Sequence, residues 1–145
     1  MNTQQLRNYM LTDPYIRQYY GGVIPRDRLP IVVKKPVIYI VNTDPSSLPG
    51  EHWVTLFMDT VCEHFDSSGL EPKKDFENFL IVYGPNYMFN KKRVQEYNTN
   101  TCGLYCLMYA YFRCRGYSFS DILNMFKDDL SINEIIVKHF YSLTS

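Results

Sequence analysis

The sequence predicts an α+β fold in which a central mixed β-sheet is flanked by helices. Helical patterns stand at both ends of the chain, whereas β-branched and aromatic runs separated by short turns occupy its middle. The 13 Tyr and 9 Phe predict a core rich in large rings. A length of 145 residues suits a single domain covering residues 1–145.

Five helices are expected from periodicity and end signals. The first begins at Thr3, a possible cap, and ends near Leu11, before Thr12-Asp13-Pro14. The remaining four are expected over 73–83, 102–115, 118–127 and 131–142, and a serine should cap each of the last two.

Four strands are expected between these helices. They cover 36–42, 53–58, 61–66 and 87–95, where β-branched and aromatic residues gather. Gly- and Pro-rich stretches at 19–23 and 25–30 are predicted to be turns, and 44–50 is predicted to be a loop.

Composition excludes several functional classes. Fifteen basic residues balance fifteen acidic ones, so the chain has no net attraction for nucleic acid. It has no apolar run of about 18 residues, so no membrane partner is expected. The N-terminus lacks the basic and apolar regions of a signal peptide, and the four cysteines lack secreted-disulfide spacing. We therefore expect an intracellular, non-secreted protein with reduced thiols.

Cys102 is the candidate nucleophile. It follows a polar loop, opens a predicted helix and precedes Gly103, and the free N–H groups of a helix N-terminus stabilise a thiolate. The alternative is that Cys102 is a small buried hydrophobic residue. Cys106 and Cys114 fit that alternative better, because they lie inside the predicted helix.

Three further positions supply the groups that a cysteine nucleophile needs. His52 starts a strand, and its near-neutral pKa suits a general base. Asp66, on the same strand face as His64, could orient that imidazole, and Gln95 could donate to an oxyanion. Each residue alone has an ordinary explanation as surface or turn residue. Their order along the chain indicates a cysteine-nucleophile hydrolase.

These positions and their flanks resemble the adenovirus-type cysteine proteases (adenains) and, more remotely, the SUMO- and ubiquitin-like-specific proteases. The matching segments are His52-Trp53, residues 65–69, Gln95 and Cys102-Gly103. Residues 20–30 also resemble the N-terminal part of adenain-like proteases from viruses and virus-like mobile elements. The resemblance covers most of residues 1–115, and the remainder matches only as helix-forming sequence.

The resemblance implies an adenain-like fold and a role for each site residue. Cys102 would be the nucleophile, His52 the base and Asp66 its orienter, while Gln95 and the Cys102 N–H would form the oxyanion hole. Trp53 and Gly103 would line a narrow tunnel that binds substrate, so that cleavage follows small residues, typically Gly. Substrates would be viral structural precursors, as for adenains, or ubiquitin-like modifiers, as for some of the wider superfamily.

Departures from the adenovirus enzymes change the expected partners. Those enzymes carry an activating peptide joined by a disulfide to a cysteine shortly before the Gln, whereas no cysteine lies between Asp66 and Gln95. They are also strongly basic and use DNA. We therefore expect no disulfide-linked activating peptide and no dependence on DNA, whereas an activating peptide bound in another way stays open. A monomer without a cofactor is also expected. By resemblance it would act in the virion and in the nucleus of an infected cell.

Two other functions stay open at this stage. The fold could be a non-catalytic binding module for a viral or ubiquitin-like protein. Alternatively, four side chains could bind zinc, although their spacing lacks a second tight ligand loop: Cys62, His64, Cys102 and Cys106.

Overall fold

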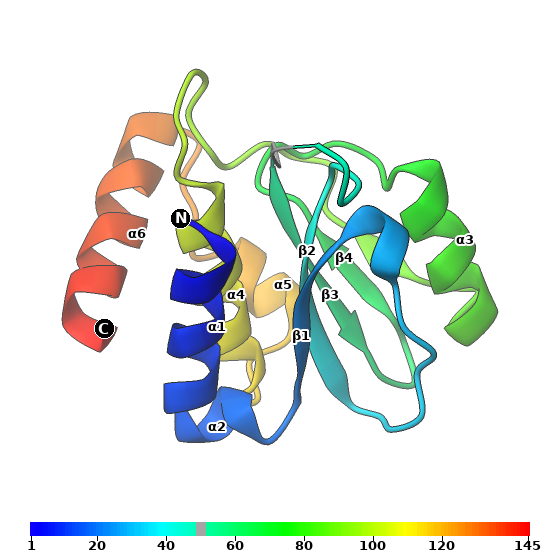
Figure 1. Ribbon diagram of the computed structural model, residues 1–145. Coiled ribbons are helices and arrows are strands. Elements are labelled where there is room, and N and C mark those ends of the chain that lie inside the picture. Colours follow the sequence, from blue (N-terminus) through cyan, green and yellow to red (C-terminus); the bar gives the residue numbers. More distant parts are fainter. Residues whose placement is uncertain (49–51) are drawn as a thin grey trace.

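The computed structural model describes residues 1–48 and 52–145, and a five-stranded sheet lies at its centre (Figure 1). The strand order is β1-β2-β3-β4-β5, with β1/β2 and β4/β5 parallel and the inner pairs antiparallel, which confirms the predicted mixed sheet. The strands are β1 (Tyr20–Pro25), β2 (Val37–Asn42), β3 (Trp53–Met58), β4 (Glu63–Phe65) and β5 (Met88–Phe89).

Helices cover both faces of this sheet, as Figure 1 shows. One face carries α1 (Thr3–Thr12), α2 (Pro14–Arg17), α4 (Cys102–Arg113), α5 (Phe119–Leu123) and α6 (Leu130–Thr144), whose buried residues share one core cluster. The other face carries α3 (Lys74–Tyr83) and, beside it, the short 3-10 helix η1 (Arg26–Arg28). The result is a three-layer α+β arrangement, as predicted.

Strand alternation divides the core between the two faces. Ile38 and Ile40 of β2 pack with α1 and α4, whereas Tyr39 between them packs on the α3 side. On β4, Phe65 stacks on Tyr109 of α4 at a centroid distance of 4.7 Å. His64 faces the other way, toward α3, as the period of two requires.

Residues 20–25 form a strand where the sequence predicted turns. The Gly21-Gly22 pair suggested a turn, but β1 runs parallel to β2 and buries Val23. A Cβ on Gly21 would come within 2.3 Å of the Tyr39 ring, so glycine allows this close approach. Sheet pairing therefore overrides the local glycine signal.

The predicted strand at 87–95 is wrong over most of its length, because only Met88–Phe89 pairs as a strand. Beyond it, the backbone N–H groups of Val94 and Gln95 both donate to the carbonyl of Ser67, at 2.9 and 3.0 Å. The chain thus follows the turn after β4 instead of continuing along the sheet. This path brings Gln95 toward the end of β4.

The ends of the five predicted helices agree with the structure to within about two residues, except at the C-terminus of α5. Two of the predicted N-cap residues are wrong. Asn2, not Thr3, caps α1 in a capping box with Gln5, and Asp129, not Ser131, caps α6. Ser118 caps α5 as expected, but that helix ends at Leu123. No helix in the described part of the chain is long and apolar enough to cross a bilayer.

Candidate active site

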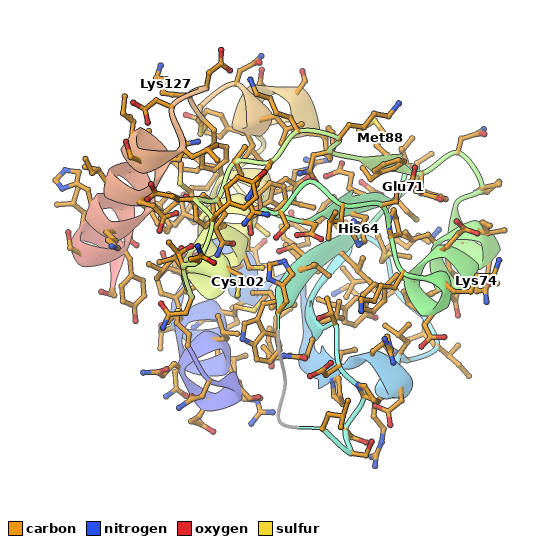
Figure 2. All side chains as sticks on the ribbon, turned by 90° about the horizontal axis from the view of Figure 1, so that it is seen from above. His64, Glu71, Lys74, Met88, Cys102 and Lys127 are labelled. Carbon is orange, nitrogen blue, oxygen red and sulfur yellow. The ribbon has the colours of Figure 1, made fainter. Side chains whose placement is uncertain are left out.

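The predicted site residues meet at one edge of the sheet. His52 directly precedes β3 and Asp66 directly follows β4, and these strands are antiparallel, so the start of one lies beside the end of the other. Cys102 is the first residue of α4, which packs on β3. Figure 2 shows Cys102 at that helix start, beside the end of the sheet.

His52 is held by Asp66. The imidazole Nε2 lies 2.7 Å from Oδ1 of Asp66, whose side chain is 6% exposed. That same Oδ1 accepts the backbone N–H of Ser68 at 2.8 Å. With Nε2 bound to a carboxylate, the ring presents its other side to Cys102, and the two side chains are hydrogen-bonded.

The Cys102 thiol and the His52 imidazole favour their charged forms. Burial opposes the thiolate, but hydrogen bonds from His52 and from the Trp53 and Gly103 main chain leave the Cys102 pKa below its usual value. Burial also opposes the imidazolium, yet Asp66 and Cys102 raise the pKa of His52 to about 9. The raised pKa departs from the near-neutral value expected from the sequence, because Asp66 and Cys102 flank the ring. Each of the two side chains therefore stabilises the charged form of the other.

The thiol pKa values of the other three cysteines are shifted in the opposite direction. Burial raises the pKa of Cys62, raises that of Cys114 to about 12 and raises that of Cys106 well above its usual value. Among the four thiols, Cys102 alone has a lowered pKa. The sequence-based distinction between Cys102 and the other cysteines thus matches their surroundings in the structure.

Gln95 is buried and oriented by two neighbours. Its Oε1 accepts the Ser67 hydroxyl at 2.6 Å, and its Nε2 donates to Thr99 at Oγ1 (2.9 Å) and more weakly at O (3.3 Å). The Thr99 carbonyl can only accept, so the amide nitrogen faces the loop that leads to Cys102. Both bonds of this NH₂ group go to Thr99, so a substrate oxygen would take the place of one of them, most easily the weaker one to the carbonyl.

Asn90 is a positioning residue that sequence reasoning missed. Its side chain is buried, and it brackets the main chain of Asp66: Nδ2 donates to the Asp66 carbonyl at 2.6 Å and Oδ1 accepts the Asp66 N–H at 2.9 Å. The sequence does contain one indication of this role: Asn90 lies inside a segment predicted to be a strand, where asparagine is disfavoured. Such a residue commonly bonds to nearby backbone instead.

The turn after β4 requires glycine at its end. Gly69 has a φ of +71°, and an added Cβ would lie 2.5 Å from the backbone N of Arg93. Its N–H donates to the Asp66 carbonyl at 2.8 Å. This turn therefore packs against the segment that carries Gln95, and no side chain fits between them.

Trp53 and Gly103, predicted to bind substrate, both contact Met1. The Trp53 indole N–H donates to the Met1 carbonyl at 3.0 Å. A Cβ on Gly103 would meet the Met1 side chain at 3.2 Å. The structure thus brings the two predicted wall residues to one place, with Met1 between the helix start and the indole.

A hollow lies on each side of the paired residues. One of about 310 Å³ is bordered by His52, Asp66, Val54 and Phe76, on the α3 side. The other, of about 260 Å³, is bordered by Trp53 and the β1 residues Val23 and Ile24. The first hollow thus reaches the imidazole and its carboxylate, and the second reaches the indole next to them in the sequence.

The zinc alternative is not supported. Within residues 1–48 and 52–145, no three His, Cys, Asp or Glu side chains gather in a way that could hold a metal ion. Cys62 lies in the core on the α3 side of the sheet, whereas Cys106 lies in the core on the α4 side.

Comparison with known proteins finds a similar viral sequence and viral proteases of similar fold. No protein-family model matches the chain. The chain is 30% identical over 108 residues to "Putative thiol protease R355" of Acanthamoeba polyphaga mimivirus, which covers 66% of this chain. The chain spans only 35% of the length of that relative.

Solved structures agree on the fold. A crystal structure of the ASFV pS273R protease superposes with a TM-score of 0.54 at 17% identity, over 84% of this chain and 60% of that one. A selenomethionine structure of the same protease gives 0.50 at 22% identity, over 69% and 43%. The chain therefore has the fold of a viral protease, and the resemblance seen in the sequence is confirmed at the level of fold.

Proposed function

We propose that this chain is a cysteine endopeptidase in which Cys102 is the nucleophile. The observation that carries the proposal is the set of contacts at one sheet edge: a thiol at a helix N-terminus, bonded to an imidazole that a buried carboxylate holds. The mimivirus relative, named as a thiol protease, supports the same chemistry. A binding module has no need of this pairing, or of a lowered thiol pKa at Cys102 alone.

In the proposed reaction, the Cys102 thiolate attacks the scissile carbonyl carbon and forms a C–S bond. The carbonyl oxygen becomes an oxyanion, stabilised by the Gln95 side-chain N–H and the Cys102 backbone N–H. The His52 imidazolium then gives its proton to the amide nitrogen as the C–N bond breaks. Water then loses a proton to the now neutral His52 and attacks the thioester carbon; the C–S bond breaks, the carboxylic acid product leaves, and the Cys102 thiolate and His52 imidazolium are restored.

The proposed substrate is a polypeptide with Gly before the scissile bond. Support comes from the resemblance to adenains and from the position of Trp53 and Gly103, which both lie against Met1 at the start of α4. Structural precursors of a virus or virus-like element are the proposed natural substrates. By resemblance, the virion and the nucleus of an infected cell are the proposed sites of action.

The proposed protease also works without a disulfide-linked activating peptide and without DNA. No cysteine lies between Asp66 and Gln95 to hold an activating peptide, and the net charge is zero, so neither a disulfide-linked peptide nor DNA is required. Helices from both ends of the chain pack on α4, which supports a single protease domain over residues 1–145. A monomer is also part of the proposal.

Mass spectrometry with a peptide library tests this function. The chain should cleave after Gly, and Cys102→Ala should abolish cleavage. A Gly→Leu replacement before the scissile bond should remove turnover. Equal turnover of the Leu peptide would refute the specificity, and activity that appears only with a cysteine-bearing peptide or DNA would refute the independence. Cleavage of ubiquitin-like precursors, but not other Gly peptides, would assign the substrate to that class instead.

A further inference from the structure

A buried glutamate of α6 lies behind the nucleophile. Glu134 is 5% exposed, and its carboxylate accepts three hydrogen bonds. The donors are the Thr101 hydroxyl at 2.7 Å, the Tyr105 hydroxyl at 2.5 Å and, more weakly, the Glu96 backbone N–H at 3.3 Å. All three donors are neutral groups.

The three donors lie next to the groups proposed to stabilise the oxyanion. Thr101 directly precedes Cys102, Tyr105 lies one turn further along α4, and Glu96 directly follows Gln95. The neighbouring Asn133 donates to the Val94 carbonyl at 2.9 Å. The first turn of α6 therefore holds both the Gln95 segment and the start of α4.

Thr101 shows how this arrangement departs from ordinary helix capping. A threonine at the N-cap normally accepts a hydrogen bond from the first turn of its helix. Among the described residues, the Thr101 side chain makes no such capping bond, and its hydroxyl donates to Glu134 instead. The Thr101 side chain thus bonds to α6 instead of to the first turn of its own helix, where the Leu104 N–H donates to the Thr101 carbonyl at 2.9 Å.

Stability alone does not explain a carboxylate in this place. Burial of a charged group costs free energy, and a well-packed apolar side chain often stabilises a helix contact at least as well. A carboxylate, however, can hold several donors at fixed positions with its two oxygens. Its location near the N-terminus of α4 also suits the helix dipole.

We propose that Glu134 is a positioning residue that sets the geometry of the oxyanion hole. By binding Thr101, Tyr105 and Glu96, it fixes the Cys102 N–H relative to the Gln95 amide. This inference rests on the proposed protease function. It adds a role for α6, for which the sequence resemblance gave no function.

Helix α4 offers a matched pair of variants for the test. Tyr105 and Tyr109 are both fully buried and each donates to a buried glutamate, Tyr105 to Glu134 and Tyr109 to Glu63. Only Tyr105 belongs to the network around Thr101 and Glu96. Tyr105→Phe and Tyr109→Phe each remove one phenol oxygen from the same helix, so their costs in stability should be similar.

The experiment compares Tyr105→Phe, Tyr109→Phe and Glu134→Gln with the unchanged chain. Tyr105→Phe should lower kcat roughly 5- to 10-fold, the scale of one hydrogen bond, and Glu134→Gln about 10- to 100-fold, with KM changed less than 3-fold in both. Affinity for a peptide aldehyde, whose hemithioacetal oxygen occupies the oxyanion hole, should fall in parallel with kcat. Tyr109→Phe should leave both within 2-fold.

The outcomes separate this inference from the protease proposal. Equal effects of the two tyrosine variants on kcat and aldehyde affinity would overturn the role of Glu134, while loss of activity in Cys102→Ala would still uphold the protease. If Glu134→Gln unfolds at lower temperature but keeps kcat in its folded form, its role is structural and the inference fails. Activity that survives Cys102→Ala would instead overturn the protease proposal.

Discussion

The two ends of helix α4 are anchored by buried glutamates in different ways. Near the C-terminal end, Glu63 of β4 is paired with Arg113, whose Nη2 lies 3.0 Å from Oε2, and also bonds to Tyr109. Near the N-terminal end, Glu134 is held by neutral donors. Both arrangements suit the helix dipole, which favours a cation at the C-terminus and an anion at the N-terminus.

The charged pair at Glu63 holds α4 on the sheet, whereas the neutral donors at Glu134 hold the start of α4 beside the nucleophile. The Arg113 guanidinium makes a strong bidentate ion pair with Glu63, far from the thiol. An equally strong cation beside Cys102 would compete with His52 for the thiolate. Neutral donors around Glu134 position the helix start without adding such a charge. The C-terminal end of α4 thus serves the fold, and the N-terminal end serves the site.

The largest expected effect is at the N-terminal end. Cys102→Ala should abolish peptide hydrolysis, and His52→Ala should cost nearly as much, because nucleophile and base act as one unit; losses of roughly 10⁴ or more in kcat are typical. Alanine at Cys62, Cys106 or Cys114 should leave activity largely intact. Limiting iodoacetamide followed by peptide mapping should mark Cys102 first. Preferential labelling of another thiol would contradict this assignment.

Gln95→Ala should have the next largest effect. Loss of one oxyanion donor lowers kcat by roughly 10²–10³. Steady-state kinetics on a Gly-containing peptide measure it, and Gln95→Glu is a control of the same size that lacks the N–H. A change in KM alone would mean that Gln95 binds substrate and does not stabilise the oxyanion.

Arg113→Met tests the opposite end of the helix. It leaves Glu63 buried without its cation, and breaking such a pair costs about 3 kcal/mol, at the lower end of the usual range because Arg113 is partly exposed. Urea unfolding measures this loss. The kcat of the folded variant should stay within 2-fold, and a large fall in kcat would mean that the two ends of α4 are not separable.

Asp66→Asn should have an intermediate effect on kcat, because Asp66 only orients the imidazole and stabilises the imidazolium, and it should also change the pH profile. The His52 pKa is raised to about 9, so the imidazolium acid is present below that pH and lost above it. Removal of the Asp66 charge lowers this pKa, so the alkaline limb of kcat/KM should move to lower pH. An unchanged alkaline limb would show that another group titrates there.

Much of the site could be predicted because its residues lie where regular elements begin or end. His52 precedes a strand whose bounds were predicted as observed, and Cys102 opens a helix predicted from its polar loop. Strand alternation also placed His64 and Phe65 on opposite faces. These features depend on local sequence patterns, which a single sequence contains.

The remainder depends on contacts between distant segments. The position of Gln95 comes from backbone bonds to Ser67, so a strand was predicted where the chain follows a turn. Asn90 and Glu134 act through residues that are 24 to 38 positions away in the sequence. The raised pKa of His52 likewise requires Asp66 and Cys102 to be adjacent, which composition and spacing do not reveal.

The turn of residues 66–69 links two functions in a single piece of backbone. Asp66 orients the imidazole, while Ser67, the next residue, orients the Gln95 side-chain amide through its hydroxyl and holds the Gln95 main chain through its carbonyl. A shift of this turn therefore misaligns the base and the oxyanion donor together. Defects in the two should be non-additive, and the enzyme would lose activity as if a single component had failed. Gly69, with no room for a Cβ, is the position where one methyl group would have that effect.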